Sequence, residues 1–162
     1  MITIIKLLIS FFSATIFHWA FMAIFGEVGI TVNIMLIFAM VICAYLKPEF
    51  GYPTAFLSGL FLDFFGVKLF GCNAFIFTLC ACAIYGMEKR LDFDGVIPQV
   101  FSIFFLTVSA SLLNLLLLKV FTGFSAWSGF WPWIGGITLN AVLTPFVFKI
   151  LHRIFAIEIK IS

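Results

Sequence analysis

Asp63, His18 and Ser58 are the polar residues within apolar stretches whose types are suited to chemistry. An acid with an imidazole can relay protons, and a serine activated by a histidine can act as a nucleophile. The supporting patterns are missing, because the sequence has no HExxH motif and no histidine inside a span after Ser58. We therefore expect His18 to be a hydrogen-bonded packing residue and Ser58 to pack against a neighbouring helix. We expect no enzymatic activity.

The four cysteines form no recognisable metal or redox motif. They lie within or at the edges of apolar segments, and no CxxC sequence occurs among Cys43, Cys72, Cys80 and Cys82. The one close pair, Cys80 and Cys82, falls on different sides of a helix. We expect four buried thiols that behave as small apolar side chains, and we expect no metal and no cofactor.

Asp63 is the only carboxylate inside a predicted span. A charge within hydrocarbon costs about 2.5 to 3.5 kcal/mol on insertion scales, so this side chain should face protein or water. Two interpretations are open. Asp63 accepts hydrogen bonds from backbone N–H groups or Asn73 and fixes the hairpin between the third and fourth spans, or it contacts a partner protein directly.

A stripe of small residues leads to this acid at intervals of four: Gly51, Ala55, Gly59 and Asp63. On a helix these four residues share one face. Small residues at this spacing let a second helix backbone approach closely within lipid. The stripe therefore predicts a packing face, directed either at another span of the same chain or at a partner helix.

Composition indicates an integral membrane protein. Hydrophobic residues make up 64% of the 162 residues and charged residues 10%, and the mean hydropathy is +1.26. A soluble domain of this size would expose a large apolar surface and aggregate. No basic run is long enough to bind nucleic acid. We predict one all-α transmembrane domain covering residues 1–162, a compact bundle with six spans at residues 7–25, 30–46, 52–66, 71–87, 96–118 and 134–151.

The basic residues predict the orientation. Seven of the nine lie at the termini and in the even-numbered loops, whereas the other side has only Lys68 and Lys119. By the positive-inside rule both termini are then cytoplasmic. The loop of residues 122–133 is external, and we expect its tryptophans to lie at the lipid headgroups of the bilayer, namely Trp127, Trp131 and Trp133.

Several spans carry polar residues on one face. Asn114 follows Thr107 and Ser111 at helical spacing in the fifth span, Asn140 lies in the sixth, and Asn73 lies near the start of the fourth. Hydrogen bonds between helices in membranes contribute roughly 0.6 kcal/mol each. These asparagines are therefore candidates for helix packing or partner binding, as is the turn residue Gly71.

Two patches resemble the rod shape-determining protein MreD family. The first is Gly59, Leu60 and Asp63 followed by Gly71 and Asn73, which is similar to the family's GLxxD and G-x-H/N-A signature. The second is TLNAVLTPF in the last span, residues 138–146. Chain length and the six-span plan agree as well. Asn73 stands where the family often has histidine, a change that preserves a hydrogen bond.

The resemblance implies a non-enzymatic, multi-pass subunit of the cell-elongation machinery in the bacterial cytoplasmic (inner) membrane. Its implied partners are the transmembrane helix of MreC and, indirectly, the actin-like MreB and the peptidoglycan polymerase and transpeptidase pair. We expect a scaffold for cell-shape control.

The family is also similar in architecture to the substrate-binding membrane subunits of energy-coupling-factor transporters. The alternative function is therefore a small-molecule, vitamin-type binding subunit, for which Asp63, Asn73, Asn114 and Asn140 are the available polar groups. The outer loops are poor in charge, which argues against a charged vitamin.

Overall fold

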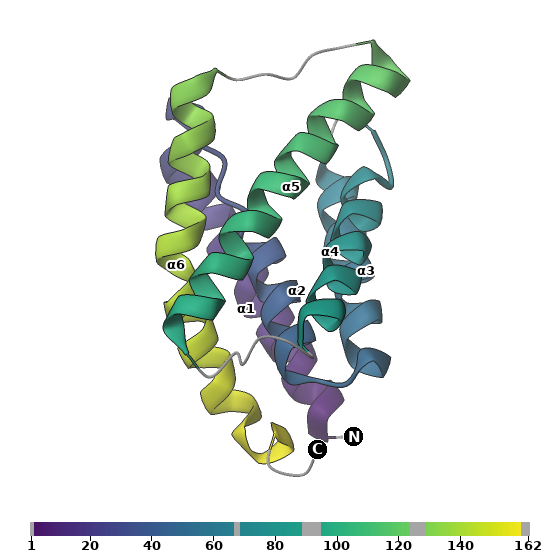
Figure 1. The fold of residues 1–162 in the computed structure, drawn as a ribbon, viewed down its shortest axis with the longest axis vertical. Coiled ribbons are helices and arrows are strands. Elements are labelled where there is room, and N and C mark those ends of the chain that lie inside the picture. The colour runs from purple at the N-terminus through teal and green to yellow at the C-terminus, as the bar shows by residue number, and fades with distance from the viewer. Residues whose placement is uncertain (1, 67–68, 89–94, 124–128, 160–162) are drawn as a thin grey trace.

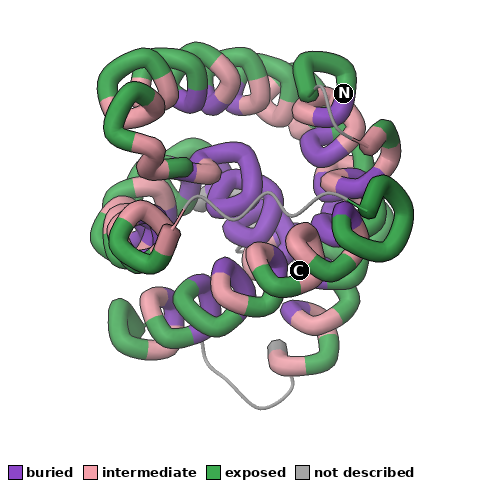
Figure 2. The backbone as a smooth tube through the Cα atoms, turned by 90° about the horizontal axis from the view of Figure 1, so that it is seen from above, coloured by how far each residue is buried: buried purple, intermediate pink, exposed green. Residues whose placement is uncertain are grey.

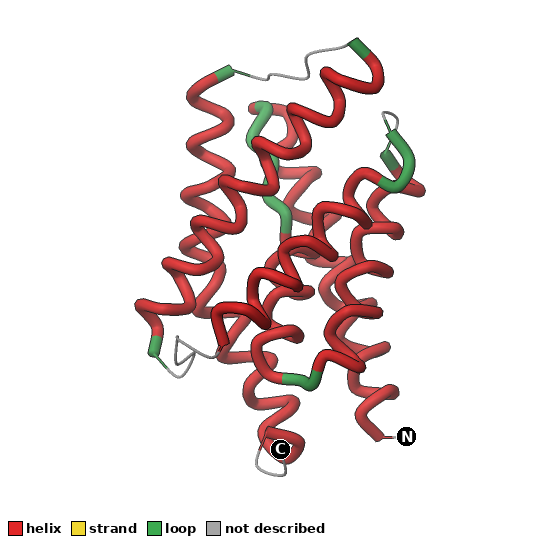
Figure 3. Tube along the Cα trace, turned by 45° about the vertical axis from the view of Figure 1, so that its right-hand side comes forward, coloured by secondary structure: helices red, strands yellow, loops and turns green. Residues whose placement is uncertain are grey.

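The computed structural model describes residues 2–66, 69–88, 95–123 and 129–159. In these residues the structure is all-helical and no strand occurs (Figure 3), which confirms the all-α part of the predicted fold class. The elements are α1 (Ile2–Phe25), a short 3-10 turn (Gly26–Val28), α2 (Ile34–Tyr45), α3 (Pro48–Phe65), α4 (Cys72–Glu88), α5 (Val96–Thr122) and α6 (Phe130–Ile159).

Three of the described helices are long and apolar enough to cross a membrane: Thr3–Val28, Val96–Thr122 and Phe130–Phe155. Helices α2 and α4 are apolar but shorter. The start of α1 and the end of α6 lie at the same end of the bundle (Figure 1). Six membrane crossings and a cytoplasmic location of this end remain predictions.

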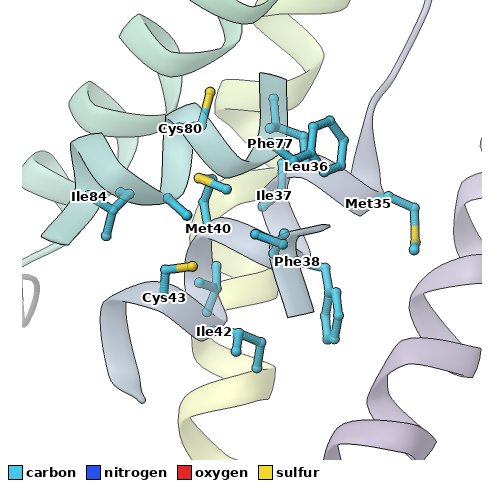
Figure 4. Packing of buried hydrophobic residues seen from close by; sticks show 14 of the residues in the cluster. Met35, Leu36, Ile37, Phe38, Met40, Ile42, Cys43, Phe77, Cys80 and Ile84 are labelled. Atoms are coloured by element: carbon cyan, nitrogen blue, oxygen red, sulfur yellow. The ribbon is translucent and has the colours of Figure 1, made fainter. Parts of the chain in front are cut away.

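Helix α2 is the centre of the bundle. Its first ten residues, 34–43, are all buried, and the more exposed helices surround it (Figure 2). A helix that is apolar on every side can be covered by lipid or by other helices, and here other helices cover it. Figure 4 shows side chains of α2 packed beside Phe77, Cys80 and Ile84 of α4. The hydrophobic core is thus built around α2.

The second predicted span begins too early. We predicted residue 30, but α2 begins at Ile34. The Asn33 side chain caps the helix by accepting a hydrogen bond from the backbone N–H of Leu36 at 3.0 Å. The backbone N–H of Asn33 itself donates to Oδ1 of Asn140 at 3.0 Å. A cap and a long-range hydrogen bond at this residue hold the preceding segment out of the helix.

The predicted external loop is too long. Helix α6 begins at Phe130, so Trp131 and Trp133 belong to its first turn and not to a loop. Gly129 adopts a positive φ of 106° just before the helix. Pro132 is tolerated in the first turn, because a backbone N–H at this position would have no acceptor within the helix. Trp127 lies outside the described residues. Five further helix ends also extend past the predicted spans, at residues 2, 48, 88, 122 and 159.

Helices α3 and α4 form the largest contact between helices in the described residues. A Cβ atom added to Gly59 would lie 2.5 Å from the carbonyl oxygen of Asn73 and 2.6 Å from backbone atoms of Ala74. These are distances that real Cβ atoms do not reach, and backbone cannot rotate away as a side chain can. Glycine at position 59 is therefore required for this approach.

We expect Gly59→Ala to destabilise the protein, by about 1–3 kcal/mol, because the added methyl group overlaps the backbone of α4. The matched control is Gly86→Ala, since a Cβ at this helical glycine meets nothing within 4 Å. Unfolding by sodium dodecyl sulfate, added to protein in dodecyl maltoside, measures both. Equal stability of the two variants would contradict the close approach at Gly59.

Candidate functional site

The small-residue stripe of α3 faces the interior of the bundle. Gly51, Ala55, Gly59 and Asp63 are all buried. Gly59 lies against the start of α4, and Gly51 lies against Tyr85 near the end of α4. The carbonyl oxygen of Gly51 also accepts a hydrogen bond from Sγ of Cys43 in α2 at 3.5 Å. This face of α3 is thus covered by α4 and α2 of the same chain.

Asp63 joins the end of α3 to the start of α4. Its Oδ1 accepts hydrogen bonds from the backbone N–H of Asn73 at 3.0 Å and from the Asn73 side-chain amide at 2.9 Å. Its Oδ2 accepts from the backbone N–H of Ala74 at 3.0 Å. With three donors on two oxygens, the buried acid is well satisfied.

The position of these donors explains how an acid is accommodated here. Helix α4 begins at Cys72, so the N–H groups of Asn73 and Ala74 belong to its first turn and have no partner within the helix. Asp63 supplies that partner from another helix, at the end where the helix dipole favours negative charge. Gly71 makes the turn before α4 with a φ of 87°. These contacts confirm the hairpin interpretation of Asp63.

The other two residues suited to chemistry, Ser58 and His18, are also buried. Ser58 is fully buried in α3, and His18 of α1 is 8% exposed. Among the described residues, neither Ser58 Oγ nor His18 Nδ1 has a hydrogen-bond partner. The prediction of a hydrogen-bonded His18 is therefore wrong for Nδ1. The imidazole ring packs edge-on against Trp19, with a centroid distance of 6.0 Å.

The cysteine prediction needs one correction. Cys43, Cys72 and Cys80 are buried, but Cys82 is exposed. Two residues along a helix turn the side chain through about 200°, so burial of Cys80 against α2 leaves Cys82 on the outer face. No group of three or more histidine, cysteine, aspartate or glutamate side chains suited to a metal ion occurs in the part of the chain that is described.

The asparagines that the sequence placed on separate spans meet around one cavity of about 450 Å³. Asn73 of α4, Asn114 of α5 and Asn140 of α6 all line it. A fourth, Asn33, lines it from the segment before α2 and was missed in the sequence. Its signal was present, because Gly29 and then Asn33 before an apolar run is a typical helix start.

The tryptophans of the predicted outer loop separate in the structure. Trp131 is 81% exposed at the start of α6, whereas Trp133, two residues further along the helix, lines the cavity. The exposed indole of Trp131 suits the lipid headgroup level, where tryptophan is favoured.

Fold and site together define a helical membrane protein whose buried polar groups hold helices together at their ends. A family model for the rod shape-determining protein MreD matches residues 1–154. The chain belongs to this family, and it is therefore a membrane protein of rod-shape determination. No curated protein and no solved structure shows a significant match to it.

Removing the Asp63 carboxylate should destabilise the α3–α4 hairpin. Asp63→Leu leaves two backbone N–H groups of α4 and one side-chain amide without their acceptor, at about 1–3 kcal/mol for each buried group. Asp63→Asn retains one acceptor oxygen and should be less harmful. The same detergent unfolding titration ranks the variants. A leucine variant as stable as the wild type would show that the three hydrogen bonds are unimportant.

Proposed function

We propose that this protein is a non-enzymatic scaffold of the bacterial cell-elongation complex that binds the transmembrane helix of MreC within the cytoplasmic membrane. The family match supports a role in rod-shape determination. The observation that carries the binding proposal is the outer face of the α3–α4 hairpin, which is apolar and exposed. Through MreC the scaffold connects indirectly to MreB and to the peptidoglycan polymerase and transpeptidase pair.

The lengths of the helices favour this face over the others. Helix α3 has 18 residues and α4 has 17, or about 27 and 26 Å, whereas α1, α5 and α6 have 24, 27 and 30 residues. A hydrocarbon core is about 30 Å thick, and short helices relieve the mismatch by thinning the bilayer or associating with other helices. A partner helix beside α3 and α4 would cover the side of the bundle that fits the bilayer least well.

The shape of this face suits a helix. Its exposed apolar residues are Phe56, Leu57 and Phe64 on α3 and Phe75 and Leu79 on α4. Further along α4, Cys82 and Gly86 are exposed small residues four positions apart. Small residues at this spacing allow close approach of a helix in lipid. The internal glycine stripe contributes indirectly, because it holds α3 and α4 close together and so fixes this outer surface.

The proposed orientation follows the charge distribution. Both termini lie in the cytoplasm, and the starts of α2, α4 and α6 lie on the external side, because most basic residues flank the opposite end. Trp131 then lies at the outer headgroups. In this arrangement MreC would cross the membrane beside α3 and α4.

Co-purification with MreC in mild detergent tests the proposal. We expect wild type to capture MreC and Gly86→Leu to reduce capture at least tenfold, because a leucine at this open position blocks helix approach on the proposed face. Ser109→Leu is the matched control, since it places leucine at an exposed small residue on α5. Thermal unfolding checks that all three proteins fold equally well.

Two outcomes would overturn the proposal. If wild type captures no MreC, the chain does not bind that partner through its membrane domain. If Ser109→Leu reduces capture as much as Gly86→Leu, the α3–α4 face is not the binding surface. Gly59→Leu is unsuitable for this test, because position 59 is an internal contact and its variants would report folding.

The cavity favours a second candidate function, a small-molecule binding subunit of an uptake transporter. It supplies the converging polar groups that this function needs, including Asn73, Asn114 and Asn140. Uptake of a labelled solute that depends on this protein would support transport. The scaffold is preferred because the family match concerns cell shape.

A further inference from the structure

The cavity lies at the end of the bundle opposite the termini. Its wall combines the second half of α1, the segment before α2, the end of α3, the starts of α4 and α6, and the middle of α5. Helix α2 begins only at Ile34, and the segment before it is not helical and fills less space than a helix would. Helices α5 and α6 also diverge toward this end (Figure 1). The space therefore follows from the fold.

The asparagines on the wall have hydrogen-bonding groups to spare. Asn33 and Asn140 use their amide oxygens, accepting from backbone N–H groups at 3.0 Å each. Their NH₂ groups are left as donors. Asn114 uses its NH₂ group toward Sγ of Cys72 at 3.8 Å and keeps its oxygen as an acceptor. Donors and an acceptor from three different elements thus surround the same space.

Two further polar side chains of the wall are buried and unpaired in the described part of the chain. They are Thr107, which is 4% exposed, and His18, whose Nδ1 has no partner. Buried polar groups in proteins are almost always hydrogen-bonded, so exceptions beside a cavity call for an explanation. Packing between helices would be served as well by apolar residues here. A molecule bound in the cavity would supply the missing hydrogen-bond partners of these two side chains.

The wall also limits the charge of that molecule. Among the described residues, no aspartate, glutamate, lysine or arginine lines the cavity. Asp63 is close in the chain to Asn73 but has its oxygens occupied by three donors. Taking an ion out of water without an opposite charge is costly. The site therefore suits an uncharged molecule.

Aromatic and amide side chains define its shape and functional groups. Trp19, Phe77 and Trp133 are among the lining residues, and aromatic side chains favour the binding of flat rings. Amide side chains with both donors and acceptors complement a carboxamide or lactam edge. A volume of about 450 Å³ is within the usual range of small-molecule sites.

We propose that the cavity binds an uncharged, planar ring compound bearing a carboxamide or lactam group. The amide edge of the compound pairs with Asn33, Asn114 and Asn140, and its ring lies against the aromatic side chains. This inference is independent of MreC binding, because the α3–α4 outer face and the cavity use different residues. A ligand here would connect the starts of α2 and α6 to α5.

Thermal unfolding of the full chain in dodecyl maltoside tests the ligand class with two matched pairs of probes. Nicotinamide and uracil are uncharged, whereas nicotinate and orotate have related rings with a carboxylate. We expect the uncharged probes at millimolar concentration to raise Tm by about 2–4 °C, because a ligand that binds only the folded state stabilises it. The anions should leave Tm unchanged.

Variants locate the site. Ser111→Leu fills the cavity from α5 and should abolish the shift caused by the uncharged probes, whereas Ser109→Leu, on the exposed face of the same helix, should retain it. Asn140→Leu should also abolish it, but this change removes the hydrogen bond to Asn33 as well. Ser111→Leu is therefore the decisive variant.

Three results would overturn the proposal. They are no shift with either uncharged probe, equal shifts with the anions, or a shift that Ser111→Leu retains. Native mass spectrometry provides the remaining check. A phospholipid retained by wild type and lost from Ser111→Leu, without any effect of the probes, would assign the cavity to lipid and refute the proposed ligand class.

Discussion

The structure depends on a buried acid placed at the start of a helix. Asp63 in a hydrocarbon environment is costly by itself, and the first-turn N–H groups of α4 are costly without acceptors. Bringing them together satisfies both at once, and the helix dipole favours the arrangement. The contact is possible only because Gly59 lets the two backbones meet one turn earlier. Gly59 and Asp63 therefore together fix the geometry of the α3–α4 hairpin.

That hairpin in turn encloses α2. A helix with ten consecutive buried residues needs neighbours on all sides, and α4 and α3 supply a large part of them. Because α2 is short, the chain before it must be extended, and Asn33 with Asn140 satisfies its backbone. The late start of α2 also leaves a polar cavity at one end of the bundle. Rigid packing at the centre and open space at the end thus have a common cause.

The division of surfaces clarifies how one small membrane domain can serve a complex. Its inward glycine stripe stabilises the fold, and its outward α3–α4 face is available for a partner helix. Variants of the stripe would disturb both, whereas variants at Gly86 or Leu79 act on the outer face alone. A ligand in the cavity would act on a third region. The three regions use different residues, so variants can test each of them separately.

The sequence by itself indicated the all-helical class and the family, and it narrowed the role of Asp63 to two interpretations. Within lipid, long apolar segments such as these satisfy their backbone hydrogen bonds as helices, and a carboxylate separated from Asn73 by a turn has few ways to be satisfied. It also predicted the stripe as a packing face, but not its occupant, because small residues suit a helix from any chain. Only the tertiary structure decided that α4 covers the stripe, that α2 starts at Ile34, and that distant asparagines share a cavity. Those outcomes depend on contacts between segments far apart in the chain, which local spacing does not encode.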